Sequence, residues 1–180
     1  MPTSVKRTLA ISLIERYLDA VGLSGPEYDE TAQRMVDMHL NEFEGKEAVI
    51  RTFPNERRHD QLVIMRKMLL HGFCPHHLLP YFGHADVGYL PDKHLVGLSK
   101  IPRVVAACCA RPTLQENLAA SIADQLEFAL KPKALYVCIT AQHTCVTSRG
   151  IASVGTEAVT SVCRGPLALE PTLKAEFFTL

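Results

Sequence analysis

Apolar residues recur at every third or fourth position near the start of the chain, which predicts two amphipathic helices. The first is expected over residues 5–21 and is ended by the glycines and proline of residues 22–26. The second is expected over residues 31–43. Residues 44–60 are mostly polar, so we expect a loop there.

Strand-like and helical segments follow in the rest of the chain. The predicted strands cover residues 61–70, 83–90, 134–141 and 157–163. The first two strands flank a histidine-rich turn at residues 71–80. The predicted helices cover residues 99–110, residues 113–130 and a short segment that begins at Pro171. This order predicts an α+β fold with a largely antiparallel sheet.

The charge balance argues against a nucleic-acid partner. The 180 residues hold 19 Lys and Arg against 19 Asp and Glu, so the chain has no overall basic field. No apolar run approaches the ~18 residues of a membrane span, and the start of the chain lacks the apolar core of a secretion signal. We therefore expect a soluble cytoplasmic protein that binds neither nucleic acid nor a membrane.

The six cysteines fall into two groups. Four of them lie in apolar stretches, where a free cysteine behaves as a small hydrophobic residue. These four are Cys108, Cys109, Cys138 and Cys163. The other two, Cys74 and Cys145, have histidines close by and are candidates for chemistry.

These two cysteines belong to clusters of possible metal ligands. One cluster is Cys74-Pro75-His76-His77, and the other is His143-Thr144-Cys145. Cys-x-x-His is a common first half of a zinc site, and three protein ligands with an open position are typical of catalytic zinc. From spacing alone, surface histidines beside buried cysteines are an equally good interpretation.

Two further patterns allow both a functional and a structural interpretation. Ser99 begins a predicted helix on which Lys100 and Arg103 share a face, an arrangement that can hold a phosphate or form a solvated basic turn. Thr113 and Glu116 have the spacing of a helix capping box.

The order of these motifs is more specific than any one of them. The relevant segments are Cys74–Gly83, Val87–Pro91, Val96–Lys100, Arg111–Leu118 and His143–Gly150. Shorter counterparts follow at Thr160-Ser161, Arg164-Gly165 and Glu176-Phe177. With these motifs the chain closely resembles the GTP cyclohydrolase I family over nearly its whole length.

The resemblance implies a zinc site and two histidines that transfer protons. By matching positions, Cys74, His77 and Cys145 would bind one Zn²⁺ per subunit. His143 and His76 would be catalytic. The chemistry needs such groups because C8 of guanine is a poor electrophile until N7 is protonated, and because zinc activates water near neutral pH.

The resemblance also implies a GTP-binding set. Glu116 would accept hydrogen bonds from N1–H and the 2-amino group of guanine, with Gln115 and the Ser99 backbone nearby. This implied role replaces the capping interpretation of Glu116. The cations that would hold the triphosphate are Lys100, Arg103, Arg149 and Arg34.

The family's reaction, fold and assembly complete the expectation. Family enzymes hydrolyse GTP, release C8 as formate and form 7,8-dihydroneopterin triphosphate. Their tunnelling fold joins antiparallel sheets from several subunits into a barrel, typically in a decamer of two pentamers with shared sites. Here, residues 1–45 would be an N-terminal helical region, forming a single structural unit with a catalytic domain over residues 46–180.

One residue departs from the family pattern. The family commonly has Glu between the cysteine and the first histidine, where this chain has Pro75. The alternatives are a variant cyclohydrolase with a different product or with iron as its metal, and an inactive oligomeric relative that binds nucleotide for regulation.

Overall fold

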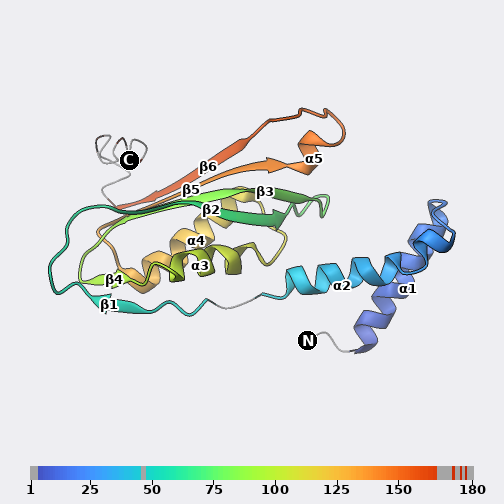
Figure 1. Ribbon diagram of the computed structural model, residues 1–180, viewed down its shortest axis with the longest axis horizontal. Coiled ribbons are helices and arrows are strands. Elements are labelled where there is room, and N and C mark those ends of the chain that lie inside the picture. The colour runs from blue at the N-terminus through green and yellow to red at the C-terminus, as the bar shows by residue number, and fades with distance from the viewer. Residues whose placement is uncertain (1–3, 46–47, 166–171, 173–174, 176, 178–180) are drawn as a thin grey trace. The chain divides into compact units, whose positions relative to one another are not determined.

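The chain forms two compact units, Met1–Glu44 and Gly45–Leu180. The computed structural model describes residues 4–45, 48–165, 172, 175 and 177. The first unit contains α1 (Ser4–Ala20), the short 3-10 helix η1 (Pro26–Tyr28) and α2 (Thr31–Phe43), labelled in Figure 1. Both long helices were predicted, α2 with the observed bounds. That residues 1–45 and the catalytic domain make a single structural unit stays a prediction.

An ion pair links the two helices of the first unit. The Arg7 guanidinium donates to both carboxylate oxygens of Asp37 at 2.7 Å. This bidentate bond raises the pKa of Arg7 and lowers that of Asp37. Arg34, on α2, pairs with Glu30.

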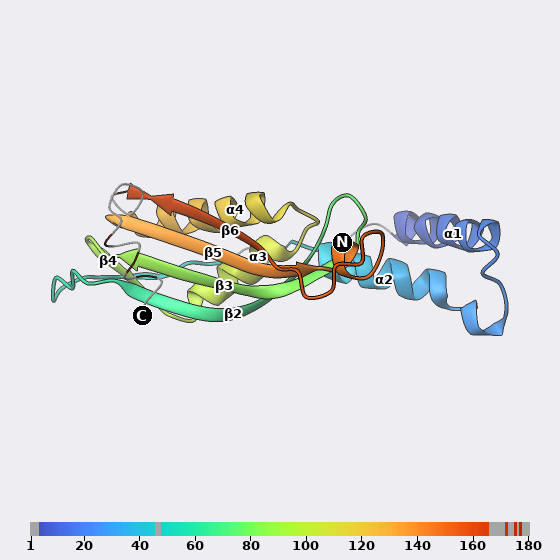
Figure 2. The same cartoon turned by 90° about the horizontal axis from the view of Figure 1, so that it is seen from above.

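The second unit is built on an antiparallel four-stranded sheet with the order β2-β3-β5-β6. Its strands are β2 (Val63–Phe73), β3 (Pro80–Leu90), β5 (Ala134–His143) and β6 (Ala158–Arg164). Two helices, α3 (Lys100–Cys109) and α4 (Gln115–Leu130), lie on one side of the sheet (Figure 1), and Figure 2 shows the strands passing in front of them. The α+β class and the antiparallel sheet are confirmed.

The core lies between this sheet and the two helices. Strand residues alternate, so that Leu70, Ala85 and Val137 are buried in the core while Leu69, next to Leu70, is 90% exposed. From α4, fully buried side chains such as Ile122 complete the core. Each buried Leu or Ile contributes about 1.5–3 kcal/mol, which fixes the sheet against the helices.

The expected loop at residues 44–60 is wrong in part, because it contains β1 (Thr52–Pro54). β1 pairs with β4 (His94–Val96), which had not been predicted either. Each strand has three residues, too short for an alternating pattern, and both depend on a partner about forty positions away.

Two other expectations concern the ends of elements. β2 and β3 run further than predicted, so the histidine-rich turn is shortened to residues 74–79. The helix expected from Pro171 lies largely outside the described residues. No helix within the described ranges is both long enough and apolar enough to cross a bilayer.

Candidate metal centre and catalytic site

The turn between β2 and β3 brings Cys74 and His77 together. The Cys74 N–H donates to the Leu79 carbonyl, and the Leu78 N–H donates to the Cys74 carbonyl, both at 2.9 Å. Leu78 has a left-handed φ of 51°, which lets the chain reverse within six residues. Two paired backbone bonds therefore hold the Cys-x-x-His segment in one conformation.

Cys145 reaches the same place from β5. β5 ends at His143, which is paired with Tyr81 at the start of β3, and the short helix α5 (Thr144–Thr147) follows at once. The Thr144 hydroxyl donates to the Pro80 carbonyl at 2.6 Å. Strand register and this bond place α5 beside the turn.

Cys74, His77 and Cys145 form a cluster whose ligand atoms all lie within 4.8 Å of one another. Cys74 Sγ is 3.6 Å from His77 Nδ1. Zn–S bonds of about 2.3 Å and Zn–N bonds of about 2.0–2.1 Å at tetrahedral angles place such atoms about 3.6 Å apart. The three residues thus fit a Cys₂His zinc site, and Cys74 is 5% exposed whereas His77 is exposed.

The two thiols affect each other. Burial raises the pKa of the Cys145 thiol, and the nearby Cys74 raises it further, while Arg149 opposes both effects. Two sulfurs this close repel each other as thiolates, so a divalent cation between them would remove the penalty. The electrostatics therefore favour a bound cation, and they place Arg149 near the cluster.

His143 lies beside the cluster and is held on two sides. Its ring stacks on Tyr81 with centroids 4.6 Å apart and an interplanar angle of 27°. Its Nε2 is 2.8 Å from Oε1 of Gln115. Burial lowers the pKa of His143, and the Glu116 carboxylate works against this shift.

Glu116 does not form the expected capping box. Its carboxylate is close enough to His143 to affect the pKa of that ring. Helix α4 begins at Gln115, and the residue at its N-cap is Leu114, whose side chain has no hydrogen-bonding group. The Thr113 hydroxyl donates to the Leu114 carbonyl and does not cap the helix. Leu114 has an extended backbone, with φ −68° and ψ 145°, so the helix begins one residue later than a Thr113 cap would require. The exposed Glu116 carboxylate has no hydrogen bond or ion pair within the described part of the chain.

Ser99, Lys100 and Arg103 lie far from this cluster within one chain. They belong to the first turn of α3, at the sheet end where β3 finishes. The Thr113 N–H, beyond the other end of α3, bonds the Phe73 carbonyl next to the turn. Since α3 has ten residues, its ends are separated by about 15 Å. Arg34 belongs to the first unit, and its role stays a prediction.

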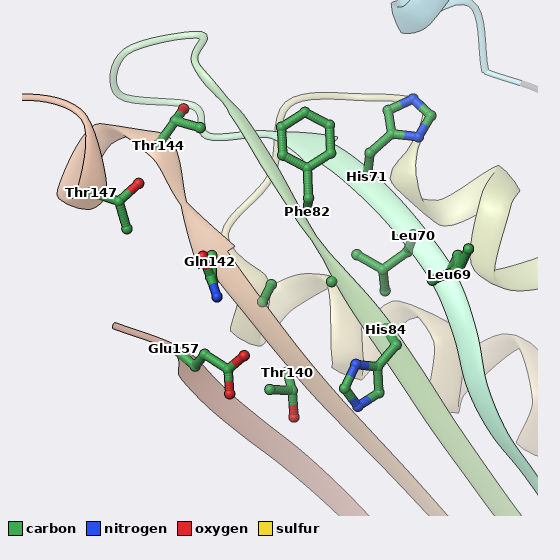
Figure 3. Close-up of a pocket in the computed structure, with 12 residues that line it drawn as sticks. Leu69, Leu70, His71, Phe82, His84, Thr140, Gln142, Thr144, Thr147 and Glu157 are labelled. Carbon is green, nitrogen blue, oxygen red and sulfur yellow. The ribbon is translucent and has the colours of Figure 1, made fainter. Parts of the chain in front are cut away.

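A cavity of about 600 Å³ lies apart from the Cys74, His77 and Cys145 cluster. It lies on the open face of the sheet, away from α3 and α4, where Figure 3 shows His71, Phe82, His84 and Glu157 around it. None of the three clustered ligands lines it.

Sequence reasoning missed the role of Tyr81 and the burial of Gln115. Tyr81 is completely buried, its hydroxyl has no partner among the described residues, and burial raises its pKa strongly. It fits because Gly72 has no side chain, since a Cβ there would be 2.5 Å from the Tyr81 hydroxyl. Gly72 and Tyr81 face each other only in the folded register, so the sequence offered no signal for this contact.

Comparisons with known proteins show the family of the chain. The family model described as GTP cyclohydrolase I matches residues 12–180. The chain is similar to GTP cyclohydrolase 1 of Nitrosospira multiformis, with 42% identity over 74% of this chain and 70% of that one. It is also similar to the enzymes of the same name from Streptococcus agalactiae (37%, covering 92% and 90%) and Carboxydothermus hydrogenoformans (36%, covering 97% and 93%).

A solved structure gives a weaker match. The crystal structure of the archaeosine synthase QueF-Like in the apo form has a TM-score of 0.49 and 18% identity, over 58% of this chain and 93% of that one. This likeness supports no conclusion about the chain. The family model covers residues 12–180 and the relatives match most of the chain, so the chain belongs to the GTP cyclohydrolase I family.

Proposed function

We propose that this protein is a zinc-dependent GTP cyclohydrolase I, which hydrolyses GTP at C8, releases formate and yields 7,8-dihydroneopterin triphosphate. The observation that carries the proposal is the Cys74, His77 and Cys145 cluster beside a half-buried His143. Two thiols and an imidazole suit zinc, and membership of the family supplies the substrate class.

Each residue near the cluster has a distinct task. Cys74, His77 and Cys145 would hold the zinc, which activates water for hydrolysis when bound. His143 would deliver a proton to N7 of guanine, which makes C8 more electrophilic. Glu116 would accept hydrogen bonds from N1–H and the 2-amino group, and the exposed His76 would transfer a second proton.

The triphosphate would be held by Lys100, Arg103, Arg149 and Arg34. Lys100 and Arg103 lie at the other end of α3 from the cluster, so one chain does not complete the site by itself. A neighbouring subunit that presents its own α3 would supply them. This separation supports a site shared between subunits.

The sheet favours assembly for a second reason. β2 and β6 are its outer strands, and in the described ranges no other strand pairs with their outer edges. Unpaired edges are prone to join strands of another chain. We therefore propose that sheets join between subunits into a barrel, in a decamer of two pentamers.

Sedimentation equilibrium tests this assembly. We expect a particle of about 200 kDa, ten times the 19.9 kDa chain. A pentamer would argue against the decamer but would agree with a site shared between subunits. A monomer at working concentrations that still turns over GTP would contradict both.

Pro75 is the residue that favours the alternative of an inactive, nucleotide-binding relative. The substitution Pro75→Glu tests that alternative. Pro75 is exposed in the turn and has a φ fixed near −65°, so it preorganises the ligands while leaving no carboxylate there. We expect the natural protein to release formate from GTP. Pro75→Glu should change the rate by no more than about tenfold, the lower end of the effects of residues that orient metal ligands.

Formate release by the zinc-loaded natural protein and by Pro75→Glu is compared under identical conditions. If the natural protein binds GTP without releasing formate and Pro75→Glu restores release, the chain is a nucleotide-binding relative and the proposed activity is wrong. Formate without the expected pterin would instead indicate the variant cyclohydrolase.

A further inference from the structure

Gln115 uses all the polar atoms of its side chain although it is only 3% exposed. Its Nε2 donates to the Ile139 carbonyl at 3.0 Å and to the Ala158 carbonyl at 2.9 Å, and lies 3.2 Å from the Thr160 hydroxyl. Its Oε1 is 2.8 Å from His143 Nε2. Gln115 therefore connects α4, β5 and the start of β6 to the ring of His143.

These partners fix the orientation of the amide. A backbone carbonyl only accepts hydrogen bonds, so the end of the side chain that faces Ile139 and Ala158 must be the NH₂ group. A flipped amide would place an oxygen against two carbonyl oxygens, with an unsatisfied acceptor in a buried place. Oε1 must then be the atom that faces His143.

The orientation of Gln115 in turn fixes the protonation of the His143 ring. An amide oxygen only accepts, so His143 Nε2 must carry a hydrogen. Nδ1 is then the ring nitrogen that Gln115 does not engage. Stacking on Tyr81 restricts the ring plane as well.

We infer that Gln115 is a positioning residue that accepts a hydrogen bond from the Nε2–H of His143, and so leaves Nδ1 as the ring nitrogen available to the substrate. The catalytic consequence of this inference rests on the proposed function. The presence of a hydrogen on Nε2 of His143 does not depend on it. It assigns the Gln115 side chain to His143, in place of the guanine contact that the family resemblance implied.

Solid-state NMR of the full-length, zinc-loaded protein tests the protonation pattern directly. The protein is labelled with ¹³C and ¹⁵N in histidine, and the His143 signals are assigned by their loss in His143→Asn. At about pH 8, where ordinary imidazoles with a pKa of about 6.5 are neutral, we expect the Nε2–H tautomer. A neutral Nδ1–H tautomer would overturn the inference, whether or not the protein turns over GTP.

Steady-state kinetics test the catalytic consequence. Gln115→Met keeps the length of the side chain but removes its donor and acceptor, and we expect kcat for GTP to fall by about 10–100-fold. KM should stay nearly unchanged, and the NMR signals should show that the Nε2–H form is no longer enforced. A raised KM with an unchanged kcat would make Gln115 a substrate-binding residue and would overturn the inference.

Gln125→Met is the matched control, because Gln125 is an exposed glutamine of the same helix whose Nε2 contacts Cys108 Sγ at 3.3 Å. It should retain the kinetics and the His143 signals of the natural protein. If the natural protein fails to turn over GTP, the proposed function fails, and the NMR result still decides the role of Gln115. If Gln115→Met does not fold, the NMR experiment on the natural protein remains decisive.

Discussion

Replacing Cys145 with alanine should remove both the zinc and the turnover of GTP. Cys145 supplies one of only two sulfur ligands, and its pKa is already raised by burial and by Cys74, so its thiolate depends on a bound cation. A bound metal ion stabilises the transition state by several kcal/mol, so we expect the rate to fall by at least about 10³-fold when it is lost. Zinc is measured by atomic absorption on the protein as purified and after dialysis against zinc.

Cys108→Ala is the control for this loss. Cys108 is also a half-buried free cysteine, but it lies on α3 outside the cluster. Its replacement should leave about one zinc per subunit and near-normal turnover. Full zinc occupancy in Cys145→Ala would show that the cluster has been assigned wrongly.

Glu116→Ala should abolish the turnover of GTP while the zinc stays bound. The carboxylate is exposed and does not cap α4, so its loss costs little stability beyond about 0.3–1 kcal/mol from the helix dipole. A site built around particular donors disfavours a substrate without them by ~10⁴-fold or more, so the natural protein should also reject ATP. Formate release from GTP and from ATP, with zinc content, provides the measurement.

The control is Glu127→Ala, since Glu127 is another exposed carboxylate of α4 and pairs with Arg164 at the opposite end of the helix. Its replacement should leave GTP turnover close to that of the natural protein. Near-normal turnover in Glu116→Ala would show that Glu116 does not bind guanine.

The long elements were predictable because their patterns repeat. α2 runs for 13 residues, so its apolar face recurs often enough to define both ends. β5 could be recognised from Tyr136, Val137 and Ile139, but its last two residues are more polar and were missed. β1 and β4 are stabilised by each other rather than by a local pattern, which a sequence alone does not reveal.

The candidate site was predictable only in part for the same reason. The two ligand clusters could be identified from residue types, while their proximity depends on the register that pairs Tyr81 with His143. The contact between Gln115 and His143 joins residues 28 positions apart and requires the packing of α4 on the sheet. Nothing in the local sequence distinguishes a buried glutamine from one that contacts the substrate.

Product stoichiometry with zinc-loaded protein tests the proposed activity most directly. GTP is incubated with the protein, formate is measured enzymatically, and the pterin is measured by fluorescence after oxidation. We expect formate and dihydroneopterin triphosphate in equal amounts, with neither product from Cys145→Ala. Bound GTP recovered intact from a zinc-loaded protein, with no formate released, would contradict the proposed activity.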